Sequence, residues 1–227
     1  MSTWIHRYQL FLFDFDGLLV NTEDLHYAAY VEMCKERGFD LDWSMERFFE
    51  AAHFNATGLR EGIYAKFPAL FAQEPRWEVL YEEKKRAYMR LLMSGKLSLM
   101  PGVAPLLKEL ETAGIKRCVV TNSTAEQTEC IRDLLPELKS IPEWITRESY
   151  AHPKPHPECY QKAVEKLGRP GDRVIGFEDS FRGFQALTGA GVKGVLIAPR
   201  SHPQTPSLPQ GILHFESFSE ISSSVLE

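Results

Sequence analysis

The chain has 227 residues, of which 44% are hydrophobic and 25% charged, and its formal net charge is −5. This composition is typical of a globular protein that buries a core, either as one large domain or as a core with an insertion. The negative charge argues against general nucleic-acid binding, because that function needs a basic face. We expect no membrane span and no signal peptide, since no apolar run has the required length.

The cysteines are scattered along the chain and form no CxxC pair, so we expect no metal site built on sulfur. They are Cys34, Cys118, Cys130 and Cys159. Reduced, buried thiols in the cytoplasm are the expectation for such a pattern. Nothing in the sequence indicates an oligomer, and a monomer is the default expectation.

The first predicted element is a strand over residues 10–13, followed at once by Asp14, Asp16 and Gly17. Carboxylates seldom border a buried apolar run unless a partner such as Mg²⁺ pairs with them. In open parallel sheets, ligands bind beyond the carboxyl ends of the strands, where this pair would lie. One alternative stays open at this segment, namely a helix-capping aspartate followed by an ordinary Asp-Gly turn.

From residue 23 to about residue 97 the sequence has helical signals and no convincing strand. Apolar spacing and end signals predict helices over residues 23–37, 45–52, 59–67 and 77–92. The last of these is strongly charged. We expect its run Glu82-Glu83-Lys84-Lys85-Arg86 to form a solvated face.

Strand and helix signals alternate after Pro101-Gly102. The pattern predicts strands over residues 115–120, 144–146, 173–177, 194–198 and 212–215, and helices over residues 103–113, 124–135 (capped by Ser123), 157–167, 181–188 and 218–226. Such alternation predicts an α/β protein whose parallel sheet is covered on both faces. The helical block therefore interrupts the sheet directly after its first strand.

Four separate places carry polar or charged side chains at the end of an apolar strand or just beyond it. They are Asp14 with Asp16, Thr121-Asn122-Ser123, Lys154, and Glu178-Asp179. Because the carboxyl ends of parallel strands share one edge of a sheet, we expect these groups to gather there. Carboxylates can hold a cation, while lysine, hydroxyl and backbone N–H groups hold phosphate oxygens. The set therefore suits a Mg²⁺-bound phosphate.

Each of these groups also has a purely structural alternative. Ser123 could be a helix N-cap, and Lys154 could be solvated between its flanking prolines. Glu178-Asp179 could be a helix entrance, where acidic side chains favour the helix dipole. Their joint occurrence in this order on alternating strands favours one shared site over three unrelated explanations.

In this combination the sequence resembles the haloacid dehalogenase superfamily over essentially its whole length. The family's four motifs are similar to residues 14–23, 119–123, 153–157 and 176–180. The helical block resembles the helical cap of the branch that contains phosphoglycolate phosphatase and β-phosphoglucomutase. The resemblance implies a Rossmann-like three-layer α/β/α core over residues 1–18 and 99–227, with a helical cap domain over residues 19–98 as a mobile lid.

The resemblance also implies a role for each motif residue. Asp14 would attack phosphorus to give an aspartyl-phosphate, and Asp16 would act as general acid and then as general base. Thr121 and Lys154 would complete the catalytic set. Asn122 and Ser123 would bind the phosphorylated substrate.

Mg²⁺ is the cofactor that the resemblance implies. Its ligands would be Asp14, the backbone carbonyl of Asp16, Glu178 and Asp179, with Glu178 binding directly or through the outer shell. Because dehalogenation needs no metal, Glu178-Asp179 together with Asp16 favours phosphate chemistry over a dehalogenase reaction.

The exact function depends on the cap, where the candidates for substrate contact are His26, His53, Asn55 and Arg60. A histidine at the position of His26 occurs both in the mutase and in many phosphatases of the branch. The stretch over residues 51–60 lacks a clear Gly-x-x-Arg element for a second phosphate. We therefore favour a Mg²⁺-dependent phosphatase acting on a small phosphorylated metabolite, either a sugar phosphate or a phosphoglycolate-like compound.

Two alternatives remain. One is a sugar-phosphate mutase, in which Arg60 or Lys66 would hold the second phosphate. The other is a non-catalytic protein that binds a phosphorylated metabolite, which the retention of Asp14 argues against. Membranes and nucleic acids are not expected partners in any of the three cases.

Overall fold

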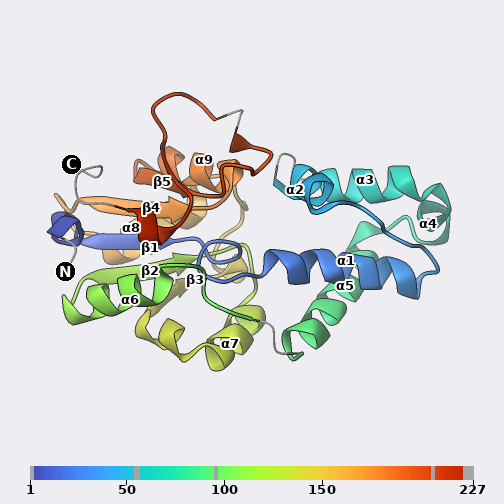
Figure 1. Cartoon of the computed structure of the whole chain (residues 1–227), viewed down its shortest axis with the longest axis horizontal. Helices are drawn as coiled ribbons and strands as arrows, with labels where there is room; N and C mark the ends of the chain where they lie inside the picture. The colour runs from blue at the N-terminus through green and yellow to red at the C-terminus, as the bar shows by residue number, and fades with distance from the viewer. Residues whose placement is uncertain (1–2, 54–56, 95–96, 206–207, 222–227) are drawn as a thin grey trace. The chain divides into compact units, whose positions relative to one another are not determined.

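The computed structural model describes residues 3–53, 57–94, 97–205 and 208–221 and divides the chain into two compact units (Figure 1). The core unit comprises Met1–Asn21 and Ser98–Glu227, and the helical unit comprises Thr22–Leu97. The two ends of the core unit that flank the insertion are paired. Val20 forms an antiparallel bridge with Leu99, and Asn21 Oδ1 accepts the Ser98 N–H at 2.7 Å.

The core unit is built on one parallel sheet with the strand order β3-β2-β1-β4-β5-β6 (Figure 1). Its strands are β1 (Leu10–Phe13), β2 (Lys116–Val120), β3 (Glu143–Ile145), β4 (Val174–Glu178), β5 (Lys193–Ile197) and β6 (Leu213–Phe215). The predicted α/β fold with a parallel sheet is confirmed. β1 lies inside the sheet and is buried along its whole length, as expected of a strand covered on both faces.

The register of the central strands brings the strand ends level. Phe13 pairs with Val119 on β2 and with Phe177 on β4. The next residue, Asp14, continues this pattern, because its N–H donates to Phe177 O at 3.0 Å. The carboxyl ends of β1, β2 and β4 therefore meet at one edge of the sheet.

Helices cover the sheet in the core unit. They are α6 (Val103–Thr112), α7 (Ala125–Leu134), α8 (Glu158–Leu167) and α9 (Phe181–Gly189), with short 3-10 helices at Thr3–Arg7, Pro136–Ser140, Arg147–Ser149 and Phe218–Glu220. On one face, Leu10 and Leu12 pack with Tyr160 of α8 and Leu187 of α9. The alternate residues of β1 point to the other face, where the Phe13 ring stacks on that of Phe177.

Two sequence-based predictions in the core unit are wrong. Ser123 is not the N-cap of α7; Thr124 is, and it forms a capping box with Gln127. The predicted last helix begins at Phe218 but is a single 3-10 turn that ends at Glu220. Residues 222–226 of that prediction lie outside the described part of the chain.

The helical unit contains α1 (Glu23–Glu36), α2 (Met45–His53), α3 (Gly58–Lys66), α4 (Pro68–Gln73) and α5 (Trp77–Leu92). Its core is an apolar cluster that includes Met33, Phe48, Ile63, Leu70 and Leu80. α4 was not expected from the sequence. It begins at a proline, which favours a first helical position, and it spans only six residues, too few for a clear period.

Among the described residues, no helix combines the length and the apolar character needed to cross a membrane.

Candidate active site

Lys154 is a positively charged side chain that lies buried at the edge of the sheet where β1, β2 and β4 end. Its side chain is 5% exposed, and its Nζ donates to Asp14 Oδ1 at 2.5 Å and to Glu178 Oε1 at 2.7 Å. A third bond goes to Val120 O at 2.8 Å. Burial alone would lower the pKa of Lys154, but the charges of the two carboxylates outweigh it and hold that pKa well above its usual value. The alternative of a solvated lysine is therefore wrong.

Asp14 lies in a crowded group of carboxylates. Burial raises the pKa of Asp14 well above its ordinary value; the negative charges of Glu178 and Asp16 raise it further, and Lys154 lowers it. Asp14, Glu178 and Asp179 each offer a carboxylate oxygen, and these oxygens lie within 4.8 Å of one another. A donor set made only of oxygens suits a hard cation such as Mg²⁺. The chemistry of these residues therefore fits a magnesium site.

Hydroxyl groups from the end of β2 hold the carboxylate of Asp16. Ser123 Oγ donates to Asp16 Oδ2 at 2.5 Å, and Thr121 Oγ1 approaches the same oxygen at 3.5 Å. Thr121 Oγ1 in turn accepts the Ser123 N–H at 2.9 Å. Asn122, by contrast, is exposed, and its Oδ1 accepts a hydrogen bond of 2.6 Å from the Tyr150 hydroxyl. Ser123 is thus a partner of Asp16 and does not cap a helix.

Glu178 is fully buried as the last residue of β4, so it is not part of a helix entrance. Ser180 fills that place, because its hydroxyl accepts the Gly183 N–H as the N-cap of α9. Glu178 Oε1 accepts hydrogen bonds from Lys154 and from the Tyr160 hydroxyl. Its other oxygen, Oε2, has no hydrogen-bond partner among the described residues.

Tyr160 is a site residue that the sequence did not indicate. Its hydroxyl donates to Glu178 Oε1 and lies 3.2 Å from Lys154 Nζ. Burial raises the pKa of Tyr160 well above its ordinary value, so the hydroxyl stays protonated and can donate. In the sequence, Tyr160 falls on the apolar face of α8 next to Cys159 and Ala163. An ordinary core aromatic shows the same sequence pattern, so the sequence alone does not identify Tyr160 as a site residue.

In the helical unit, His26 contacts a lysine that the sequence did not single out. His26 Nδ1 lies 2.6 Å from Lys84 Nζ, and the His26 ring stacks on Tyr88 with centroids 4.3 Å apart. Lys84 is 3% exposed, and its Nζ lies over the rings of Tyr30 and Tyr88. The prediction that the charged run on α5 is a solvated face is therefore wrong for Lys84.

The remaining candidates in the helical unit are not brought together with this pair by any described contact. Arg60 is exposed on α3. His53 is the last residue of α2, and its side chain lies outside what the structure describes, as does the whole of Asn55.

Comparisons with known proteins agree with this architecture. The family model described as haloacid dehalogenase-like hydrolase matches residues 11–197. Protein CbbY from Cereibacter sphaeroides is 28% identical over 216 residues, which cover 92% of this chain and 92% of that protein. A phosphorylated carbohydrates phosphatase from Thermotoga maritima is 29% identical over 190 residues, covering 81% of this chain and 82% of that protein. The crystal structure of CbbY from Rhodobacter sphaeroides in complex with phosphate has a TM-score of 0.76 at 25% identity and covers 96% of this chain and 99% of its own.

The family match runs from the second residue of β1 to the last residue of β5, so it contains each of the four strand-end groups. It also spans the inserted helical unit. The chain is an enzyme of the haloacid dehalogenase-like hydrolase family, as its motifs predict.

Proposed function

We propose that this enzyme is a Mg²⁺-dependent phosphatase that hydrolyses a small phosphorylated sugar through an aspartyl-phosphate on Asp14. The observation that carries the proposal is the buried contact of Lys154 Nζ with Asp14 Oδ1 at the edge where the strands end. This contact places the carboxylate of Asp14 next to a fixed positive charge. A carboxylate that attacks a phosphate ester needs such a charge beside it. The similarity to a phosphorylated carbohydrates phosphatase and to a CbbY protein crystallised with phosphate supports the choice of substrate class.

In this proposal Asp14 attacks phosphorus in line with the leaving sugar oxygen. Lys154 binds Oδ1, so Oδ2 forms the new O–P bond while the P–O bond to the sugar breaks. The ammonium group of Lys154 offsets the charge that develops between Asp14 and the phosphoryl oxygens. Attack requires ionised Asp14, and the positive charge of Lys154 favours this ionised form against the effect of burial.

Asp16 serves both proton transfers. It protonates the leaving alkoxide in the first step and then removes a proton from the water that hydrolyses the aspartyl-phosphate. Hydrogen bonds from Ser123 and Thr121 to Oδ2 orient its carboxylate. We assign the backbone N–H of Asn122 as a hydrogen-bond donor to the phosphoryl oxygens.

When bound, Mg²⁺ supplies positive charge to the phosphoryl group and to Asp14. We assign Asp14, the Asp16 carbonyl and Asp179 as its direct ligands. Glu178 is fully buried, and its Oε1 already accepts two hydrogen bonds, so we assign it an indirect role through Lys154.

We further propose that residues 19–98 form the cap that selects the substrate. The insertion directly follows the loop that carries Asp14 and Asp16, which supports this role. His26, held by Lys84, is the cap residue with the best-defined surroundings. His53, Asn55 and Arg60 remain candidates for substrate contact. A monomeric state and a cytoplasmic location also stay predictions.

The test is a screen of phosphorylated sugars and short phosphorylated acids with and without Mg²⁺, read for released phosphate and for isomerised product. We expect Mg²⁺-dependent phosphate release by the wild-type chain and none by Asp14→Asn. Isomerised product without phosphate release would contradict the proposal in favour of a sugar-phosphate mutase. Tight binding without any turnover would instead indicate a non-catalytic binding protein.

A further inference from the structure

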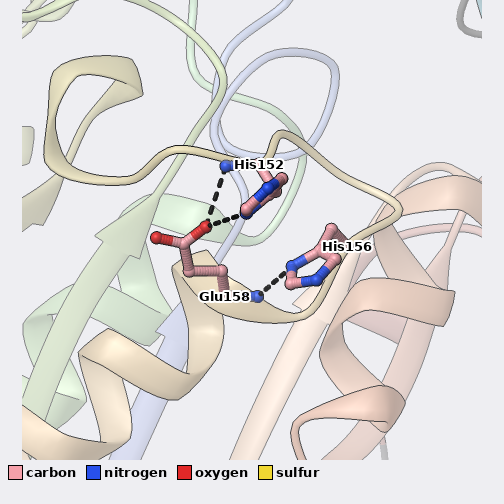
Figure 2. Close-up of side chains that lie close together, drawn as sticks. All are labelled: His152, His156 and Glu158. Atoms are coloured by element: carbon pink, nitrogen blue, oxygen red, sulfur yellow. Dashed lines mark hydrogen bonds and ion pairs between the residues drawn. The ribbon is translucent and has the colours of Figure 1, made fainter.

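Two histidines and one glutamate converge just outside the candidate active site. His152 and His156 lie in the loop before α8, and Glu158 is the first residue of that helix (Figure 2). One possible ligand atom from each residue lies within 4.8 Å of the other two. The two imidazole rings are tilted by 38° with centroids 4.7 Å apart, and both histidines are exposed. These contacts join residues of the core unit only.

Hydrogen bonds orient all three side chains, as Figure 2 shows. His152 Nδ1 lies 2.8 Å from Glu158 Oε2, and His156 Nδ1 lies 3.2 Å from the Glu158 backbone nitrogen. The N–H groups of Ala151 and His152 also donate to the Glu158 carboxylate, at 3.0 and 2.8 Å. These backbone bonds lower the pKa of Glu158 to about 2, so the carboxylate is ionised at neutral pH.

The partners fix where the protons lie. An ionised carboxylate only accepts, so His152 Nδ1 donates to Glu158 Oε2 and carries a proton. A backbone N–H only donates, so His156 Nδ1 accepts and carries a lone pair. One proton therefore joins two of the three possible ligand atoms. A divalent cation can take the place of that shared proton.

We propose that His152, His156 and Glu158 form a second metal site, which takes a nitrogen-preferring divalent cation such as Zn²⁺. Two imidazole nitrogens and one carboxylate oxygen are a ligand set for Zn²⁺ and a poor one for Mg²⁺, which prefers oxygen. Ligand atoms about 2.0–2.1 Å from a tetrahedral Zn²⁺ lie about 3.3 Å apart, within reach of small rotations of exposed rings. Water would fill the fourth position. Binding releases the His152 Nδ1 proton to solvent.

The position of this site links it to the loop that carries Lys154. His152 lies two residues before Lys154 and His156 two residues after it. Arg182 also holds this loop, by donating to Lys154 O at 2.7 Å. A cation bound by both histidines and by Glu158 would therefore tie the exposed part of this loop to the start of α8. We expect such binding to stabilise the folded core.

The test measures Zn²⁺ binding to the full chain in saturating Mg²⁺, which occupies the oxygen site. Competition with a chromophoric zinc chelator gives stoichiometry and affinity for the wild type and for His152→Gln, His156→Gln and His6→Gln. His6 is an exposed histidine outside the cluster and serves as the matched control. We expect one Zn²⁺ per chain, with affinity reduced at least tenfold by either cluster substitution and unchanged by His6→Gln.

A thermal melt with and without Zn²⁺ provides the second readout. Because a ligand that binds only the folded state raises Tm, Zn²⁺ should raise it for the wild type and His6→Gln and raise it less for the two cluster variants. Equal Zn²⁺ affinity in all four proteins, or no stoichiometric binding by the wild type, would overturn the site. Neither readout depends on turnover, so the result stands or falls separately from the phosphatase assignment.

Discussion

The backbone of Gly183 in α9 packs directly against the buried carboxylate of Glu178. A Cβ added at residue 183 would overlap both carboxylate oxygens of Glu178. Glu178 Oε1 is at the same time a partner of Lys154 Nζ, at 2.7 Å. Glycine at position 183 therefore allows α9 to approach β4 closely enough to leave the Glu178 carboxylate beside the lysine.

Gly183→Ala should push Glu178 away from Lys154. We expect a loss of about 1–3 kcal/mol in the free energy of unfolding, typical of overpacking, and a clear fall in kcat. Gly189→Ala is the matched control on the same helix, because its Cβ would lie 3.4 Å from Pro157 Cβ, an ordinary contact. Urea denaturation and phosphate release measure both variants. Equal stability of the two would contradict the role given to Gly183.

Asp14→Asn should reduce turnover by about three orders of magnitude or more, because the amide is not a nucleophile. The fold should survive, since Lys154 keeps Glu178 as a partner. Single-turnover phosphate release and far-UV circular dichroism check the two statements. Asp24→Asn, at an exposed position of α1, is the control that should keep the wild-type rate. A rate near wild type in Asp14→Asn would remove Asp14 as nucleophile.

Substitutions of the adjacent acids Glu178 and Asp179 should have different effects on Mg²⁺ dependence and on stability. Asp179→Ala should raise the Mg²⁺ concentration for half-maximal activity at least tenfold while leaving the fold stable, because Asp179 is only half-buried. Glu178→Gln should instead cost about 1–3 kcal/mol of stability, because its fully buried carboxylate accepts hydrogen bonds from both Lys154 and Tyr160. Mg²⁺ titration of activity and denaturant unfolding of both variants measure the contrast. The reverse pattern would make Glu178 the direct ligand.

The sequence carried enough information to predict the sheet and the convergence of its strand ends. The apolar runs that end at Asp14, Thr121 and Glu178 are strands, and parallel pairing alone brings their ends to one edge. The sequence offers a helix end or the phosphorylated substrate as the partner of the Ser123 hydroxyl, whereas tertiary packing gives it Asp16. Thr124, one residue later, has the same capping chemistry, so local sequence does not distinguish them.

Other parts of the site depend on burial, which residue type does not encode. Tyr160 resembles any core aromatic, and its hydroxyl matters only because Glu178 lies opposite it. Lys84 stands in a run of five charged residues whose composition is that of a solvated face. One helical position of that run turns inward among tyrosines, and the period of a charged helix with few apolar residues does not indicate which one.

Glu158→Gln should make the stability of the protein less dependent on pH. The folded-state pKa of Glu158 is lowered to about 2 from the usual 4.5, mainly by the N–H groups of Ala151 and His152, with His152 Nδ1 and Lys162 Nζ as the other facing groups. Its stabilisation is therefore complete above about pH 4.5 and is lost as the pH falls toward 2. The wild type should exceed the variant in stability at pH 5, and the difference should shrink steadily on going to pH 3.

Urea denaturation at a series of pH values between 5 and 3 measures that difference. Glu165→Gln, at an exposed position of the same helix, is the matched control, because no described hydrogen bond holds its side chain. Its difference from the wild type should stay small throughout. If the gap between the wild type and Glu158→Gln stayed constant across this range, the carboxylate charge would not be what holds the loop before α8. The difference between the two proteins would then come from a contribution that does not depend on the ionisation of Glu158.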